Sequence, residues 1–270
     1  MNDPKISVIM GIYQSKNKDM VRKAIQSIID QTFTEWEFVI CDDGSPDDTW
    51  EFLNKEYGKD ERFVLVRNEQ NGGLRVALNT CLKAASADYV VRQDADDYSR
   101  EDRLQILYDY VVQHPTIDVV GTAMVSFDES GSFGVIHPRK ENPVKMDFLY
   151  GSVVAHATTI MKKSSLNNVG GYRVAWETTR CEDTDLYMRM CANGAAFHNI
   201  DDEVYFVRQD RDSVARRKYV NRVKEAAVKF KGFQALHMPI YCYIFVLKPL
   251  IVGLIPGRLL LKIKRFLMKS

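Results

Sequence analysis

The sequence has few cysteines and none of the spacings that mark a metal centre or a disulfide framework. Its 270 residues include 5 cysteines, and no CxxC pair occurs among them. Cys41, Cys81 and Cys191 lie in apolar stretches, where buried free thiols are the expected state. We therefore expect a protein of the reducing cytosol and not a disulfide-stabilised secreted one.

The sequence also lacks targeting and low-complexity segments. The stretch from Met1 to Lys5 has neither the basic n-region nor the apolar h-region of a secretory signal. Because no repeat or low-complexity linker divides the chain, we expect one continuous α/β domain, with or without an appendage. A hydrophobic content of 46% is enough for a full core.

Acidic residues are scarce at one end of the chain, although the net charge of the whole is only +1. Residues 211–270 hold 14 lysines and arginines against Asp212 and Glu225, a net +12, and the residues before them carry a net −11. An acidic body suits metal cations, whereas a basic tail suits an anionic surface.

The first half of the chain alternates strand and helix patterns. Apolar runs predict strands at 6–13, 37–41, 63–66 and 89–91, and helical periods predict helices at 18–31, from Ser45 or Pro46 through Leu53, at 73–86 and at 101–113. This alternation predicts parallel strands joined by right-handed crossovers. The second half is less regular, with strands predicted at 119–127 and 156–161, a turn at 131–134, and a short helix at 186–192 after an acidic loop.

Two acidic clusters follow apolar runs, where stability alone does not explain them. Asp42-Asp43-Gly44-Ser45 reads either as a turn whose serine caps the next helix, or as carboxylates that accept hydrogen bonds from a nucleoside. In Asp94-Ala95-Asp96, alternate residues of an extended segment would point the same way and share one Mg²⁺ or Mn²⁺. The alternative for this triplet is a solvated acidic loop.

A third acidic group, Glu182-Asp183-Thr184-Asp185, precedes the predicted helix near residue 186. It either stabilises the helix N-terminus through the dipole or supplies a general base that must stay ionised.

Taken together, these strings resemble the family 2 glycosyltransferases, which are inverting enzymes of the GT-A fold. The similarity runs from about Lys5 to Arg217 and includes, in the family's order, Ser7–Tyr13, Gln31-Thr32-Phe33, Trp36-Glu37, Asp42–Ser45, Asn71-Gly72-Gly73, Asp94–Asp97 and Glu182-Asp183. It implies a Rossmann-like, mostly parallel sheet flanked by helices. It also implies a nucleotide-binding half at about 1–115, an acceptor half at about 116–217, and a tail at 218–270.

The resemblance also implies roles for individual residues. Asp183 would be the catalytic base, and Asp96 would hold Mn²⁺ or Mg²⁺ against the donor diphosphate. Nucleotide contacts would come from Tyr13, Asp42, Asp43, Arg75 and Asp94, and the acceptor side would include His156, Trp176 and Glu182. For His156 and Trp176, a structural place beside a strand or in the core is the alternative.

Two departures from the family pattern bear on function. Arg208-Gln209 is followed by Asp210 where many members have histidine, so Asp210 is either a further metal ligand or a surface acid paired with arginine. The Gln-x-x-Arg-Trp motif of processive members is absent, which argues for addition of a single sugar. The strings resemble most closely the bacterial enzymes of exopolysaccharide and capsule assembly, with a UDP-sugar donor and a lipid-linked acceptor.

The tail combines an apolar stretch with a basic one. Residues 239–257 are apolar except for Lys248, but Pro249 and Pro256 argue against a clean membrane span. Beyond them, basic residues share one helical face: Arg258, Lys262, Arg265 and Lys269. We expect a cytoplasmic protein whose tail lies on the inner face of the cell membrane. The alternative is a helix packed on the protein's own acidic body.

Other classes of function fit the sequence less well. A nucleotidyltransferase needs a glycine-rich phosphate loop, and the segment after the first strand offers only Gly11. A regulatory protein that binds sugar nucleotides without turnover would not need Asp43, Asp96 and Asp183 together. Nucleic-acid binding is not expected, because the tail presents an apolar face in place of a basic groove with interleaved aromatics.

Overall fold

The computed structural model describes residues 3–209 and 218–254. The strands are β1 (Ile6–Ile12), β2 (Trp36–Asp42), β3 (Phe63–Arg67), β4 (Tyr89–Arg92), β5 (Tyr98–Ser99), β6 (Val119–Asp128), β7 (Gly131–Ile136), β8 (Ile160–Lys162) and β9 (Phe197–Arg208). The α-helices are α1 (Lys18–Ile29), α2 (Thr49–Tyr57), α3 (Leu74–Ala84), α4 (Arg103–Gln113), α5 (Lys163–Asn168), α6 (Glu182–Ala192), α7 (Tyr219–Ala235) and α8 (Ile244–Leu254). Three 3-10 turns complete the set: η1 (Lys145–Tyr150), η2 (His156–Thr158) and η3 (Ile240–Tyr243).

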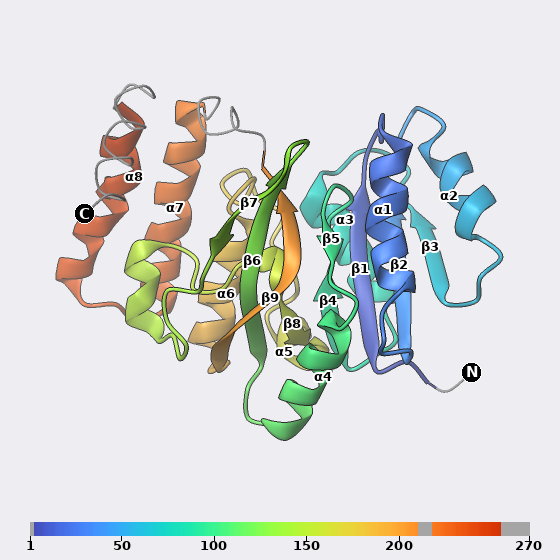
Figure 1. Ribbon diagram of the computed structural model, residues 1–270. Coiled ribbons are helices and arrows are strands. Elements are labelled where there is room, and N and C mark those ends of the chain that lie inside the picture. Colours follow the sequence, from blue (N-terminus) through green and yellow to red (C-terminus); the bar gives the residue numbers. More distant parts are fainter. Residues whose placement is uncertain (1–2, 210–217, 255–270) are drawn as a thin grey trace.

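One sheet runs through the molecule in the order β3-β2-β1-β4-β8-β6-β9-β5, with β7 paired to β6 (Figure 1). Strands β1 to β4 are parallel, as the alternating pattern predicts. β8 then runs antiparallel to β4, and β6 and β9 form a long parallel pair. Because β2 and β4 flank β1, the strand order reverses at β1, and ligands of such sheets bind beyond the carboxyl ends of the strands at this point.

Helices cover both faces of the sheet and form two cores. On one face, α1 and α4 pack apolar residues such as Ile25 and Leu107 against β1, β2 and β4. On the other face, α3, α5, α6 and α7 bury Leu78, Leu186 and Phe233 together with the opposite side of the same strands. The prediction for the first half of the chain succeeds because each helix there has one apolar stripe of helical period.

Most boundaries in the first half agree with the prediction to within two residues, and the largest difference is in α2. Helix α2 begins at Thr49, after the turn at Ser45 and Pro46. Ser45 does not cap it, because its hydroxyl accepts a hydrogen bond from the N–H of Gln14 at 2.9 Å. The serine therefore ties the end of β1 to the end of β2.

Four predictions of local structure are wrong. Residues 131–134 belong to β7, which is exposed along its whole length and so has no apolar alternation to reveal it. Residues 156–158 form a 3-10 turn ahead of the short strand β8. Ala95 and Asp96 lie in a turn and not in an extended segment. Helix α6 starts at Glu182, four residues before the predicted start at residue 186, because the acidic residues of its first turn stabilise the helix N-terminus.

The C-terminal helices α7 and α8 lie side by side at the end of the molecule far from β3 (Figure 1). η3 and α8 expose Ile240, Tyr241, Ile244, Leu247, Ile251 and Leu254. No helix within residues 3–209 and 218–254 is both long and apolar enough to cross a bilayer. The predicted basic helix beyond residue 257 lies outside the described residues.

Candidate active site

Asp42 closes β2 and is fully buried. One carboxylate oxygen accepts the N–H of Ser45 at 3.1 Å, and the other lies 3.0 Å from Nε of Arg67 in an ion pair. The turn that the sequence predicts for Asp42-Asp43-Gly44-Ser45 is therefore present. Asp42 helps to fix the conformation of the loop that follows β2.

Asp43 joins this loop to the Asn71-Gly72-Gly73 turn. Its Oδ1 accepts from Nδ2 of Asn68 at 2.7 Å and from the N–H of Gly72 at 3.2 Å, and its Oδ2 accepts from the N–H of Gly73 at 2.7 Å. Gly73 has φ of +81°, a left-handed conformation that favours glycine. Asp43 is 2% exposed, so it holds these loops together from within, whereas Tyr13, directly after β1, is 45% exposed.

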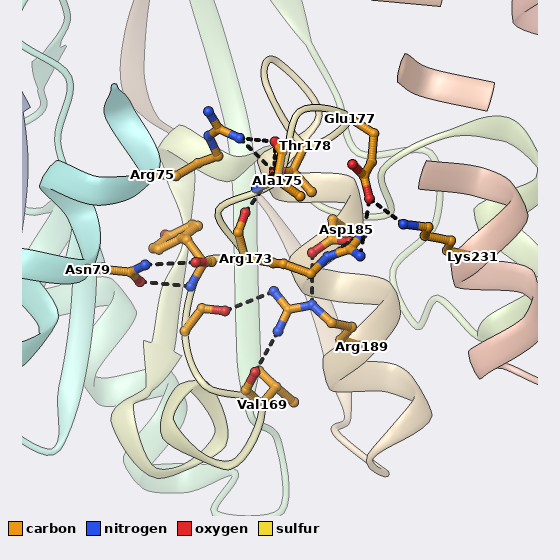
Figure 2. Close-up of polar contacts among 12 residues, drawn as sticks. Arg75, Asn79, Val169, Arg173, Ala175, Glu177, Thr178, Asp185, Arg189 and Lys231 are labelled. Carbon is orange, nitrogen blue, oxygen red and sulfur yellow. Dashed lines mark hydrogen bonds and ion pairs between the residues drawn. The ribbon is translucent and has the colours of Figure 1, made fainter. Parts of the chain in front are cut away.

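Arg75 leaves the first turn of α3 and reaches across to the loop ahead of α6. Its guanidinium donates to the carbonyl of Ala175 and to Oγ1 of Thr178 (Figure 2). The residue expected to contact the nucleotide therefore also connects the nucleotide half with the loop that leads to Asp183.

The acidic cluster after β4 divides into carboxylates with different partners. Asp97 accepts hydrogen bonds from the hydroxyl of Tyr205 at 2.8 Å and from the N–H of Arg208 at 2.7 Å, which ties it to β9. Asp94 forms an ion pair with Nη2 of Arg92 at 2.6 Å. Among the described residues, no ion pair reaches Asp96, and burial followed by the negative charge of Asp94 raises the pKa of its carboxyl group.

Two buried arginines support this cluster. Arg103 is fully buried and donates to Oε1 of Gln93, to Oγ of Ser99, and to the carbonyls of Arg92 and Ala157. Burial lowers its pKa to about 10. The sequence reasoning missed both arginines, although Arg103 stands on the apolar stripe of α4 and Arg92 ends a buried strand.

His156 bridges Arg92 and Tyr172. Its Nδ1 lies 2.7 Å from Nη1 of Arg92, and its Nε2 lies 2.7 Å from the hydroxyl of Tyr172. Because arginine can only donate, Nδ1 must accept and Nε2 carries the proton. Burial and the charge of Arg92 lower the pKa of His156 well below its usual value, so the ring is neutral.

Glu182 and Asp183 stand in the first turn of α6. Burial raises the pKa of both carboxyl groups, whereas the main-chain N–H of Thr184 and the charge of Arg92 act in the opposite direction on Asp183. Asp183 lines a cavity of about 600 Å³, together with His156 and Asn199. A partly buried carboxylate beside a cavity is in the position that a general base requires.

The loop ahead of α6 is held by a network of charged side chains (Figure 2). Arg173 and Arg189 both pair with Asp185, and Arg189 also donates to the carbonyls of Val169 and Gly171. Lys231 of α7 pairs with the buried Glu177 at 2.6 Å. Between these anchors, the Trp176 side chain is 59% exposed, so it does not contribute to the core.

Asn199 lines the same cavity, but its amide is held by the chain around it. Its Nδ2 donates to the carbonyls of Lys140 at 2.8 Å and Val153 at 3.0 Å, which orients the amide. Its Oδ1 is buried, has no hydrogen-bond partner among the described residues, and lies against Gly121, where an added Cβ atom would be 2.6 Å away. The amide oxygen therefore packs against β6 and does not face the cavity.

The family model described as glycosyl transferase family 2 matches residues 7–170. This chain belongs to that family. A putative glycosyltransferase of Bacillus subtilis, EpsE, is 36% identical over 94% of the chain and 91% of its own length. WfaP of Escherichia coli, a UDP-Glc:α-D-GlcNAc-diphosphoundecaprenol β-1,3-glucosyltransferase, is 26% identical over 91% of the chain and 94% of its own length. The family 2 protein is therefore a glycosyltransferase.

Solved structures confirm the GT-A fold of this family 2 member. Staphylococcus aureus TarS residues 1–349, in complex with UDP-GlcNAc, superposes with a TM-score of 0.66 at 22% identity, over 86% of this chain and 70% of that one. The mannosyltransferase PcManGT of Pyrobaculum calidifontis, with GDP-Man and Mn²⁺, gives 0.64 at 19% identity, over 99% of this chain and 81% of that one.

The residues of this family 2 chain fit a divalent cation only in part. Within the described residues, no group of three or more His, Cys, Asp or Glu could hold a metal by itself. Asp96 nevertheless offers an exposed carboxylate in the turn after β4, with a raised pKa that a cation would lower again. Mg²⁺ and Mn²⁺ are commonly held by one or two carboxylates plus substrate phosphates, and Asp96 suits such a site. Asp210, the other predicted ligand, lies outside the described residues.

Proposed function

We propose that this glycosyltransferase moves one sugar from a UDP-sugar to a hydroxyl group of a lipid-linked saccharide, with inversion at the anomeric carbon. The observation that carries the proposal is that Arg92 contacts Asp94, in the acidic turn after β4, and also His156, which lines the same cavity as Asp183. The donor end and the acceptor end of a transfer reaction would thus meet beside the cavity.

The chain's own groups divide the work of the reaction. Tyr13, Arg75 and the loop shaped by Asp42 and Asp43 bind the nucleotide. Asp183 accepts the proton of the attacking hydroxyl, so a single displacement inverts the sugar without a covalent intermediate. On the acceptor side, Trp176, Glu182 and the neutral His156 border the sugar.

A divalent cation completes the donor site in this proposal. Asp96 would hold it, with Asp94 near the nucleotide, and Asp210 would be a further ligand. The cation, Mn²⁺ or Mg²⁺, supplies charge stabilisation for the departing diphosphate. Support comes from the raised pKa of Asp96 and from the Mn²⁺ named in the PcManGT complex.

The lipid-linked acceptor and a peripheral place on the inner membrane face are supported by two observations. Two Escherichia coli relatives are named for transfer to diphosphoundecaprenol-linked GlcNAc. The exposed face of η3 and α8 is apolar, and the last sixty residues are strongly basic. The pathway would be exopolysaccharide or capsule assembly.

Titration calorimetry with a panel of UDP- and GDP-sugars, with and without Mn²⁺, tests the proposal. We expect binding of at least one UDP-sugar that depends on the metal, and transfer of its sugar to a lipid-linked saccharide. Absence of binding across the panel would refute the proposed donor site.

A further inference from the structure

Three cationic side chains from three separate elements meet at Leu149 and Tyr150, where η1 ends. Nζ of Lys229 in α7 lies 3.4 Å from the carbonyl oxygen of Leu149. Nη1 of Arg139 donates to the carbonyl of Tyr150 at 2.9 Å, and Nζ of Lys248 in α8 lies 5.9 Å from the centre of the Tyr150 ring. Positive charges so close together repel each other, and the transfer chemistry does not use them.

Lys229 has few hydrogen-bond acceptors for a buried ammonium group. Lys229 is 2% exposed, and its nearest carboxylate oxygen, Oε1 of Glu225, is 3.9 Å away, while Oε2 of the same carboxylate pairs with Arg222. Burial lowers the pKa of Lys229, and the charges of Lys248 and Arg139 lower it further, against the effect of Glu225. An anion bound at the exposed Arg139 and Lys248 would relieve the repulsion among the three cations.

The position of these cations suggests which anion they bind. Arg139 and Tyr150 line the same cavity as Asp183. Lys248 stands on α8 among the exposed Ile244, Leu247 and Ile251. The cations therefore lie between a cavity that holds a candidate base and an apolar surface. A lipid-linked saccharide has its parts in the same order, with the sugar first, the phosphates next and the lipid last.

We propose that Arg139 and Lys248 bind the diphosphate that links the acceptor saccharide to its lipid, with the buried Lys229 adding positive charge behind them. The inference rests on the proposed transfer to a lipid-linked saccharide and adds the site that recognises the acceptor's charged group. Phosphates of ordinary membrane lipids share this chemistry. Continuity with the cavity assigns the site to the acceptor, because a bulk lipid headgroup has no saccharide to place beside Asp183.

Binding of farnesyl diphosphate to the full-length protein, measured by calorimetry below its aggregation concentration, tests the inference without any sugar transfer. We expect farnesyl diphosphate to bind and farnesol to bind at least tenfold more weakly. Arg139→Ala and Lys248→Ala each remove an exposed side chain, so the fold is retained. Each should weaken diphosphate binding about tenfold, the loss expected for one charge-assisted contact.

The matched control is Lys55→Ala, which removes one exposed lysine from α2 and should leave binding unchanged. Equal affinity of the Arg139 and Lys248 variants and the wild-type protein would overturn the inference, as would equal affinity for farnesol. A loss of binding to phosphatidylglycerol vesicles, with farnesyl diphosphate binding intact, would assign the cations to bulk lipid and also overturn it. Metal-dependent UDP-sugar binding, measured on the same samples, tests the transferase proposal separately.

Discussion

At the scale of single residues, burial and neighbouring charge separate carboxylates that look alike in the sequence. Asp43 and Asp97 each accept hydrogen bonds at both oxygens, so they hold the loops in place. Burial raises the pKa of Asp97, to about 7, as well as the pKa of Asp96 and of Asp183. The difference lies in their partners, because no described residue forms an ion pair with Asp96, and Asp183 lines the cavity. These two are the groups whose replacement should change chemistry more than stability.

Asp183→Asn should reduce transfer by about 10² or more, because an amide cannot accept the proton of the attacking hydroxyl. Donor affinity should be unchanged, since the substitution keeps the size of the side chain. Steady-state rates and calorimetry on the same preparations check both statements. Full activity in the variant would exclude Asp183 as the base.

The raised pKa of Asp183 also predicts the direction of the pH dependence. A base works only when ionised, so kcat should fall as the pH drops through this pKa and should be retained above it. Burial places that loss at a higher pH than an ordinary aspartate would give. A pH–rate profile measures it, and a rate that stays constant down to the ordinary aspartate range would contradict the assignment.

Asp96→Asn should weaken UDP-sugar binding at least tenfold in Mn²⁺ and leave the affinity in EDTA equal to that of the wild-type protein, because only the metal-bound complex loses a ligand. Asp109→Asn, on the outer face of α4, is the matched control and should bind as the wild-type protein does. An equal loss with and without Mn²⁺ would show that Asp96 acts in some way other than through a cation.

At the scale of elements, the position of Asp183 depends on how α6 is held. Its first turn is acidic, and its side faces α7 across a close contact between Gly232 and Met188. The loop ahead of it is anchored to α3 through Arg75 and to α7 through Lys231 (Figure 2). Helices α3 and α7, which are far apart along the chain, therefore determine where the candidate base lies.

Gly232→Ala should lower the free energy of unfolding by about 1–2 kcal/mol. A Cβ atom there would lie 1.9 Å from the sulfur of Met188, which is fully buried, and this overpacking outweighs the helix preference of alanine. Urea unfolding measures the change. Gly134→Ala is the control, since its Cβ would meet nothing within 4 Å. A Gly232→Ala protein as stable as the wild type would show that α6 and α7 can separate freely.

At the scale of the whole molecule, one sheet connects the parallel strands β1 to β4 to helices whose outer face is apolar. α7 and α8 lie at the far end from β3, and the exposed residues of η3 and α8 form a surface that water solvates poorly (Figure 1). The basic charge of the same end of the chain suits an anionic membrane.

Replacing Ile244, Leu247 or Ile251 by Asp should reduce binding to phosphatidylglycerol vesicles, because each side chain is at least half exposed and would bury apolar area in the lipid. A vesicle flotation assay measures the bound fraction. Val112→Asp on α4, also half exposed, should leave binding unchanged. An equal bound fraction for all variants would place the membrane contact elsewhere.

The sequence by itself determined the parallel half of the sheet, the family and the three acidic groups. Local patterns suffice there, because each strand is a continuous apolar run and each helix in this half has one apolar stripe. The mixed half of the sheet was only partly predictable, since β7 is exposed on both faces and β5 has only two residues. These two strands form because β7 pairs with β6 and β5 pairs with β9, and the local sequence of each strand does not reveal this pairing.

Only the tertiary structure decided which acids an ion pair holds and which it does not. Asp42 and Asp96 both follow strands, yet Arg67, far along the chain, pairs with the first, and no described residue pairs with the second. The network of Arg92, Arg103 and His156 and the meeting of Arg139, Lys229 and Lys248 likewise join distant segments. The physical reason is that charge and desolvation depend on distance in space, whereas sequence patterns report only neighbours along the chain.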